Sequence, residues 1–266
     1  MKAIKLILCD LDGTILDSEK RIPANFYQVL KELQKRNIQI GMATGRPLSN
    51  IEIKFPEAKQ YLCNVAENGG CVSYHGEILH SESIPLEKCA KVVKKVREIG
   101  HCGAVLCALH ATYIENDDPC MVKKCKEYYP DLIIVEDLFE VKDTIVKISI
   151  FDFVDSWTNS YVHLKDIDAD LDCVTSGHDW ADLMNKGVSK AKGIQYLCDR
   201  MGIGMDQVMA FGDEMNDYAM LTQVGYAIAM ENAVEPIKKI CKEQCESNDN
   251  NGVMNKIIAH FDLLVD

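Results

Sequence analysis

A short apolar run that stops at a carboxylate constrains this chain more than any other feature. Residues 4–9 read Ile-Lys-Leu-Ile-Leu-Cys, and Asp10 follows directly. A run of this length bounded by a turn signal is typical of a strand buried on both faces of a sheet. Such strands occur in parallel sheets that helices cover on both sides. We therefore expect an α/β protein with polar side chains at the carboxyl end of its first strand.

The outer thirds of the chain alternate strand and helix. Apolar residues at helical spacing predict a helix after Pro23, with the buried face Phe26, Val29, Leu30 and Leu33. Further strands are expected at 38–43, 62–66, 207–211 and 225–229, a hairpin over 71–80, and helices beginning near Ser189, Asn232 and Gly252. This pattern predicts a doubly wound, Rossmann-like parallel sheet.

The middle third has a different texture. Helices are expected at 86–99 and 119–128, and strands at 103–109, 144–151 and 170–175. The stretches 115–118 and 176–180 are interpreted as loops. We expect an inserted α/β domain over residues 83–184 and a core made of residues 1–82 and 185–266.

Charge and hydropathy exclude several classes of protein. The chain has 41 acidic and 29 basic residues, a net charge of −12, which argues against a nucleic acid partner. The sequence has no apolar segment long enough to cross a bilayer, and Asp10 ends the first apolar run too early for a signal peptide. We expect a cytoplasmic protein without a membrane partner.

The twelve cysteines lack C-x-x-C spacing, and most have apolar neighbours. We expect them to be reduced, buried, small hydrophobic residues. A zinc site or a disulfide framework is the alternative. Cys241 and Cys245 are expected on one helix.

The residues with recognisable chemistry lie at predicted element boundaries. Three clusters follow strands and one begins a helix: Asp10-Leu11-Asp12-Gly13-Thr14, Thr44-Gly45-Arg46, Gly212 to Asp217, and Ser189-Lys190. The carboxyl ends of parallel strands meet at one edge of the sheet, so we expect these clusters to converge.

The predicted crevice would gather carboxylates and phosphate donors. Four aspartates brought together are costly unless a cation neutralises them, and oxygen ligands suit Mg²⁺. Hydrogen-bond donors from Thr44, Gly45, Lys190 and Asn216 suit the oxygens of a phosphate. In Asp-x-Asp, one carboxylate can attack phosphorus while the other transfers protons.

These clusters resemble the four motifs of the haloacid dehalogenase (HAD) superfamily. Further segments resemble its Cof-type phosphatases, which carry a large type C2B cap: Asn68-Gly69, Gly187 to Lys190, Ala229 to Ala233, and Asn248 to Val253. The resemblance spans both outer thirds, whereas the middle third matches in length and position more than in residues.

The resemblance implies a role for each matching residue. Asp10 would be the nucleophile and a Mg²⁺ ligand, and Asp12 the acid/base with its backbone carbonyl on the metal. Asp213 would be the third protein ligand, and Asp217 would position Lys190 or a metal-bound water. The residues that would hold phosphate are Thr44, Gly45, Lys190, Asn216 and the Leu11 amide, and Thr44 and Lys190 would also be catalytic. Asn68 and Arg46 would be supporting residues. Arg46 would either touch the substrate or tether the cap.

The main functional hypothesis is a Mg²⁺-dependent phosphomonoesterase for a small metabolite, either a sugar phosphate or a phosphorylated cofactor such as pyridoxal phosphate or FMN. Family ATPases carry Thr at the position of Asp12, so this residue favours hydrolysis or a mutase. A sugar phosphomutase is the first alternative, but it needs cap arginines, and residues 83–184 hold only Arg97. A non-catalytic phosphate-binding protein is the other, and metal-dependent turnover would dismiss it. The chain is expected to be a monomer or a homodimer.

Overall fold

The computed structural model describes residues 2–115, 117–175 and 177–265 and contains two compact units. The first unit comprises residues 1–45, 51–80 and 189–266, and the second comprises 46–50 and 81–188. Residues 116 and 176, which fall in two of the predicted loops, lie outside the described residues. The two units are described separately below.

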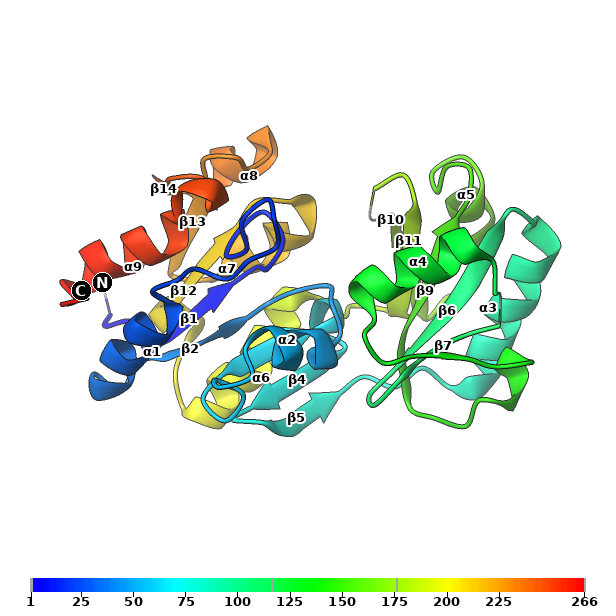
Figure 1. Ribbon diagram of the computed structural model, residues 1–266, viewed down its shortest axis with the longest axis horizontal. Helices are drawn as coiled ribbons and strands as arrows, with labels where there is room; N and C mark the ends of the chain where they lie inside the picture. The colour runs from blue at the N-terminus through cyan, green and yellow to red at the C-terminus, as the bar shows by residue number, and fades with distance from the viewer. Residues whose placement is uncertain (1, 116, 176, 266) are drawn as a thin grey trace. The chain divides into compact units, whose positions relative to one another are not determined.

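The main sheet of the first unit is parallel and has the order β14-β13-β12-β1-β2. Strand β1 (Leu6–Cys9), which lies between β12 and β2, is buried along its whole length, as an apolar run flanked by helices requires. The other strands are β2 (Gln39–Met42), β12 (Val208–Gly212), β13 (Tyr226–Met230) and β14 (Glu243–Cys245). Figure 1 shows β1 beside β12 and β2. The predicted doubly wound α/β sheet is confirmed.

The helices of the first unit pack in pairs beside this sheet. Helix α1 (Phe26–Lys35) buries the four predicted apolar residues and lies beside α9 (Gly252–Phe261). Helix α6 (Lys190–Met201) lies beside α7 (Tyr218–Gln223). The remaining helices are α2 (Leu48–Lys54), whose first residues belong to the second unit, and α8 (Glu235–Ile240). Ser189 caps α6, since its side chain accepts a hydrogen bond from the Lys192 amide, and the left-handed Gly202 ends it.

A smaller sheet extends the first unit beyond β2. Its order is β3 (Cys63–Ala66), β4 (Cys71–Tyr74) and β5 (Glu77–Ser81), so the predicted hairpin is confirmed. Isolated parallel bridges join Ile40 to Leu62 and Ala43 to Val65. The turn after β3 therefore lies near the end of β2, where the sequence places Thr44.

The second unit is a six-stranded sheet of order β10-β11-β9-β6-β7-β8, in which all neighbouring pairs except β7 and β8 are antiparallel. Apolar side chains of α3 and α5 pack on one face, and those of α4 pack on the other. The helices are α3 (Leu86–Ile99), α4 (Pro119–Tyr128) and α5 (Ser160–Leu164), and the strands are β6 (Cys102–Ala108), β7 (Thr112–Ile114), β8 (Leu132–Ile134), β9 (Ile145–Asp152), β10 (Leu171–Thr175) and β11 (Trp180–Asn185).

The cysteines are all free thiols, and Cys120 alone among the twelve is exposed. The prediction of reduced cysteines that are mostly buried is confirmed. One detail was wrong: Cys241 follows α8 and Cys245 ends β14, because a polar three-residue strand continues the sheet where a helix was expected.

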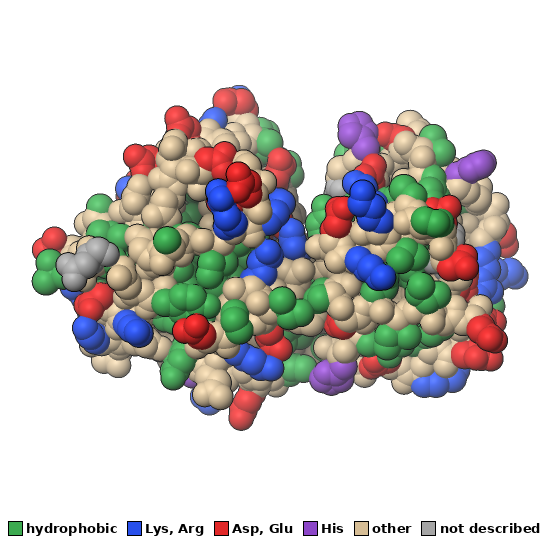
Figure 2. All heavy atoms as spheres, in the orientation of Figure 1, with side chains coloured by type: hydrophobic (Ala, Val, Ile, Leu, Met, Phe, Trp, Pro, Cys, Tyr) green, Lys and Arg blue, Asp and Glu red, His purple; other side chains and the backbone are tan. Residues whose placement is uncertain are grey.

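The surface carries mixed charge. On the face shown in Figure 2, acidic and basic side chains are interspersed over each unit, with hydrophobic side chains between them. Among the described residues, no helix combines the length and the apolar character that crossing a bilayer would require.

Candidate active site

Three strand ends bring the predicted clusters to one edge of the main sheet. Cys9 at the end of β1 lies opposite Met42 of β2 on one side and Phe211 of β12 on the other. Asp10 follows β1 directly and Asp213 follows β12, while the Thr44 loop follows β2. The sequence therefore delivers these polar side chains to a common edge because the strands are parallel and in register.

Lys190 connects two of the carboxylates. It is the first residue of α6, and its ammonium Nζ lies 2.7 Å from Asp10 Oδ1 and 2.6 Å from Asp217 Oδ1. Its side chain is fully buried. Burial alone would lower the pKa of Lys190, but Asp10 and Asp217 together raise it, so the lysine stays charged.

Asp217 holds the lysine on one side and the following loop on the other. Its Oδ2 accepts hydrogen bonds from the backbone amides of Asp213, at 2.9 Å, and Glu214, at 3.1 Å. The side chain is fully buried. Both oxygens of Asp217 are thus engaged, which fixes the loop that carries Asp213.

Asp213 is held from the opposite side by the turn after β1. The hydroxyl of Thr14 donates to Asp213 Oδ1 at 2.8 Å. Gly13 has φ +74°, and a Cβ there would lie 2.2 Å from Asp213 Oδ2, so this position requires glycine on both counts. Burial raises the pKa of Asp213 to about 6, against the lowering effect of the Thr14 hydrogen bond.

The carboxylates form a group that suits a divalent cation. Oxygens of Asp10, Asp213 and Asp217 lie within 4.8 Å of one another. Burial raises the pKa of Asp10 to about 8, and Asp217 and Asp213 add to this effect while Lys190 opposes it. A buried set of like charges with a single ammonium carries excess negative charge, which a cation with oxygen ligands would offset.

The donors predicted to hold phosphate gather around the turn after β3. The Thr44 carbonyl accepts a hydrogen bond from the Asn68 amide at 2.9 Å, and the side-chain nitrogen of Asn216 lies 3.4 Å from Asn68 Oδ1. A Cβ at Gly45 would lie 3.2 Å from the side-chain amide of Asn68. Residues Thr44, Gly45, Asn68 and Asn216 are therefore neighbours, although they come from three separate segments.

The Asn68 turn also meets the helix that carries Lys190. Residues 67, 68 and 69 all have positive φ, and asparagine tolerates this region better than most residues. A Cβ at Gly69 would lie 2.2 Å from the carbonyl oxygen of Ser189, the N-cap of α6. The glycine lets the turn approach this helix end closely.

The chain makes a tight turn directly after Asp10. The Leu11 carbonyl accepts the Leu16 amide at 2.9 Å, and the Leu11 side chain is buried. Asp12 is partly exposed, and its Oδ1 lies 2.7 Å from the Lys20 ammonium. The structure therefore gives the two aspartates different surroundings: Asp10 is buried against Lys190 and Asp12 faces an exposed lysine.

Arg46 belongs by its contacts to the second unit, unlike its neighbours Thr44 and Gly45. Its guanidinium lies 5.1 Å from the centre of the Tyr128 ring, and Nη1 donates to Asn50 Oδ1 at 3.2 Å. Asn50 in turn donates to the Tyr128 carbonyl at 3.0 Å. All of these contacts lie within the second unit.

Two residues at this edge were not predicted as site residues. Thr14 stood in the first cluster, but its hydroxyl partner Asp213 is 199 positions away in the sequence. Lys20 gave no signal, because a lysine in a polar loop is ordinarily a solvated side chain. Only the folded chain places it on Asp12.

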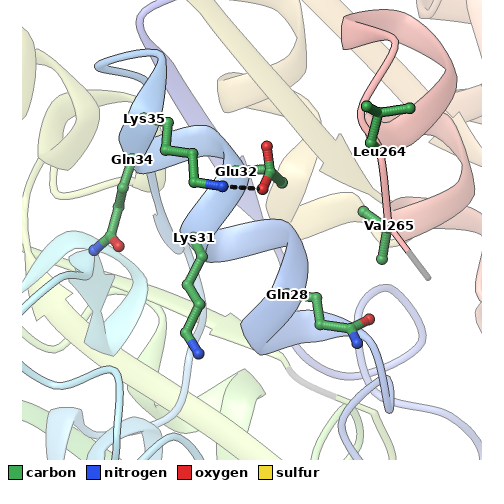
Figure 3. Close-up of a pocket in the computed structure, with 7 residues that line it drawn as sticks. All are labelled: Gln28, Lys31, Glu32, Gln34, Lys35, Leu264 and Val265. Atoms are coloured by element: carbon green, nitrogen blue, oxygen red, sulfur yellow. Dashed lines mark hydrogen bonds and ion pairs between the residues drawn. The ribbon is translucent and has the colours of Figure 1, made fainter.

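A separate surface hollow lies beside α1 and the last described residues of the chain (Figure 3). It has a volume of about 460 Å³, and Lys35 and Glu32 form an ion pair of 2.5 Å at its edge. Its lining contains none of the predicted site residues; it consists of Gln28, Lys31, Glu32, Gln34, Lys35, Leu264 and Val265.

Comparison with known proteins shows which family and which relatives this chain resembles. A family model described as haloacid dehalogenase-like hydrolase matches residues 7–257. The 5-amino-6-(5-phospho-D-ribitylamino)uracil phosphatase YbjI of Escherichia coli (strain K12) is 28% identical over 267 residues, which cover 97% of each chain.

Solved structures share the fold over nearly the whole chain. SMU.1108c from Streptococcus mutans UA159 superposes with a TM-score of 0.89 and 27% identity, covering 98% of this chain and 100% of that one. The subclass IIB sugar phosphatase BT4131 superposes with a TM-score of 0.82 at 22% identity, covering 98% and 100%, a likeness of fold.

Proposed function

This chain belongs to the haloacid dehalogenase-like hydrolases and is a phosphatase of that family, and we propose that it hydrolyses small phosphate monoesters with Mg²⁺ through an aspartyl-phosphate on Asp10. The observation that carries the proposal is the fully buried Lys190 bridging Asp10 and Asp217 beside Asp213. This arrangement supplies a nucleophile, a fixed positive charge and cation ligands at one strand edge.

The donor set fits a hard divalent cation. Asp217 is engaged at both oxygens by Lys190 and by two amides, so it supports the site. Asp10 and Asp213 would therefore ligate Mg²⁺ with carboxylate oxygens, and Asp12 with its backbone carbonyl. The bound ion would neutralise charge that develops on the transferring phosphoryl group.

The first half-reaction transfers the phosphoryl group to Asp10. A carboxylate oxygen of Asp10 attacks phosphorus, and the bond between phosphorus and the leaving oxygen breaks. Asp12 in its acid form donates a proton to that oxygen, which leaves as an alcohol. Lys190, Asn216 and the Thr44–Gly45 loop hold the other phosphate oxygens.

The second half-reaction returns the enzyme to its starting state. Asp12, now a carboxylate, takes a proton from a water molecule as its oxygen attacks phosphorus. The bond between phosphorus and Asp10 breaks, which releases inorganic phosphate and the free carboxylate. The Asp12 side chain is partly exposed, and its carboxylate lies 2.7 Å from the Lys20 ammonium, which favours the charged form that accepts this proton.

We infer that the second unit is a cap that selects the leaving group, with a sugar phosphate, a sugar-alcohol phosphate or a phosphorylated cofactor as the substrate. The relative from Escherichia coli is named for a phosphorylated ribityl compound, which belongs to this chemical class. Release of inorganic phosphate from a panel of phosphorylated metabolites would identify the preferred ester.

The surroundings of Arg97 favour hydrolysis over a mutase reaction. A mutase must bind a phosphate at the far end of its substrate, and arginine is the usual residue for this. Arg97 is already paired, with Nη2 lying 2.5 Å from Glu115 Oε2 and 2.7 Å from Asp137 Oδ1. Its guanidinium also stacks on the Phe139 ring at 4.2 Å. Its charge is therefore matched within the second unit.

The first test is metal-dependent hydrolysis of p-nitrophenyl phosphate. We expect turnover with Mg²⁺, its loss on treatment with EDTA and its recovery when Mg²⁺ is restored. Asp10→Asn should lower kcat by at least about 10⁴-fold, because the amide is a poor nucleophile. Activity that persists in Asp10→Asn or in EDTA would contradict the proposal.

A further inference from the structure

The segments that follow β13 and β14 carry no residue with a role in the proposed reaction. Side chains of these segments nevertheless bind the loop that follows Asp12. Asn232, just beyond β13, donates from Nδ2 to the Gly13 carbonyl at 2.7 Å. Gly13 is the residue directly after Asp12 and is also pressed against Asp213. The position of this backbone carbonyl is thus fixed from two sides.

Asn248, just beyond β14, makes the second connection. Its backbone amide donates to Asn232 Oδ1 at 3.1 Å, which orients the Asn232 side chain so that its nitrogen faces Gly13. The Asn248 side-chain nitrogen donates to the Leu16 carbonyl at 3.0 Å. Two strand ends therefore cooperate to bind two carbonyls of one loop.

Asp249 makes the third connection, through both of its oxygens. Oδ1 accepts the Ser18 amide at 2.8 Å, and Oδ2 accepts the Ser18 hydroxyl at 2.7 Å. These bonds hold the pKa of Asp249 below its usual range, with the Ser18 amide as the largest cause. The loop is held at a residue six positions beyond Asp12.

The far end of the loop returns to Asp12 itself. The loop closes on itself where Asp17 pairs with Arg21, and between them Lys20 adopts φ 62°. This backbone turn directs the Lys20 ammonium onto Asp12 Oδ1. Whatever fixes residues 13–21 therefore also fixes the partner of the Asp12 carboxylate.

We propose that Asn232, Asn248 and Asp249 are positioning residues that place Asp12, and Lys20 against it, by anchoring loop 13–21. This inference rests on the proposed function, because it assigns Asp12 the proton transfer to the leaving group. Proton transfer demands hydrogen-bond distance to the departing oxygen, and a displacement of about 1 Å can cost roughly 100-fold in rate. The anchoring side chains bond loop carbonyls and Ser18. The loop also contacts Asp213 through Gly13 and Thr14, so loss of an anchor should slow every ester somewhat and should slow an ester that needs the proton more strongly.

The experiment compares two esters of similar shape that differ in their need for a proton. Phenyl phosphate has the poorer leaving group, whereas p-nitrophenyl phosphate releases an oxygen that departs without protonation. The constant kcat/KM reports the steps up to departure of the leaving group and leaves out hydrolysis of the aspartyl-phosphate. For Asn232→Ala and Asp249→Ala we expect the fall in kcat/KM to be at least about tenfold larger for phenyl phosphate than for p-nitrophenyl phosphate.

Two further variants separate position from charge and from general damage. Asp249→Asn can keep both bonds, since its oxygen accepts the Ser18 amide and its nitrogen donates to the Ser18 hydroxyl, so it should retain wild-type kcat/KM. Asn255→Ala removes an asparagine of α9 whose side chain bonds Glu246 and the Asn250 carbonyl and not the loop, and it should behave as wild type. Equal losses on both esters, or a loss in Asp249→Asn equal to that in Asp249→Ala, would overturn the positioning role.

A second measurement does not depend on turnover. Hydrogen–deuterium exchange of the peptide covering residues 13–21 should be faster in Asn232→Ala and Asp249→Ala than in wild type, and unchanged in Asn255→Ala. Unchanged exchange in all variants would refute the anchoring. An inactive wild type with the expected exchange pattern would instead contradict the proposed function and leave the anchoring intact.

Discussion

Both units of this protein bury a hydrogen-bonded group of polar side chains, but the two groups lie at different places in their sheets. In the first unit, Lys190, Asp10 and Asp217 meet at the carboxyl ends of parallel strands. In the second unit, Ser149 of β9 accepts the Tyr129 hydroxyl at 3.1 Å and donates to Asp182 of β11 at 2.5 Å. This second group lies within the strands, on the face that α4 covers.

The difference separates a site from a structural network. At strand ends, side chains from loops converge on a ligand without interrupting a sheet, and excess charge there favours a cation. Within a strand, a hydroxyl and a carboxylate satisfy one another, which makes a buried polar pair tolerable and specifies how two strands align. Residue type and burial alone do not tell the Lys190 group, a candidate active site, from the Ser149 group, a structural network. Their positions in the two sheets do.

Removing the ammonium of the first group should have the largest effect. Lys190→Met leaves Asp10 and Asp217 buried without their shared counter-charge, so the free energy of unfolding should fall by about 3–5 kcal/mol. Turnover should fall by at least about 100-fold, because a fixed charge at the phosphate is lost. Urea unfolding and p-nitrophenyl phosphate hydrolysis measure the two effects.

Lys192→Met is the matched control, since this lysine lies on the same helix with its side chain exposed. It should change stability by less than about 0.5 kcal/mol and leave turnover unchanged. Equal behaviour of the two variants would mean that Lys190 has no special role.

Removing the hydroxyl of the second group should have a smaller effect and one of a different kind. Ser149→Ala takes a partner from the Tyr129 hydroxyl and from Asp182, at an expected cost of about 1–3 kcal/mol in the free energy of unfolding. Hydrolysis of p-nitrophenyl phosphate should not change. Ser160→Ala, which removes a long hydrogen bond of 3.4 Å in the same unit, is the control and should be nearly neutral. A loss of turnover in Ser149→Ala would end the distinction between the two groups.

Elements governed by local pattern could be predicted closely. Helices α3 and α4 begin and end at the expected residues, and α1 buries the expected face, because their apolar residues repeat at helical spacing. Strands β7, β8 and β14 have three residues each, too few to show alternation, and none was predicted. Strand β11 was also missed, since its mid-strand Asp182 is satisfied by Ser149, a partner 33 positions away.

The same limit applies to the site. The placement of Asp10, Asp213 and Lys190 followed from strand ends and a helix start, so the sequence could indicate that they meet. The Thr14 contact with Asp213 and the Lys20 contact with Asp12 depend on the path of a loop, which residue spacing does not determine. The resemblance included the segments that hold Asn232 and Asn248, but the carbonyls that these side chains bind could not be predicted, because a carbonyl has no signature in a sequence.

The central claim is that Asp10 becomes covalently phosphorylated during turnover. Enzyme mixed with Mg²⁺ and a phosphate monoester, quenched in acid within the first turnover and digested, should yield a phosphorylated peptide that contains Asp10. The modification should be sensitive to hydroxylamine, as acyl phosphates are, and absent from Asp10→Asn. A wild-type enzyme that turns over while its phosphate is found only free in solution, or on another residue, would contradict the account.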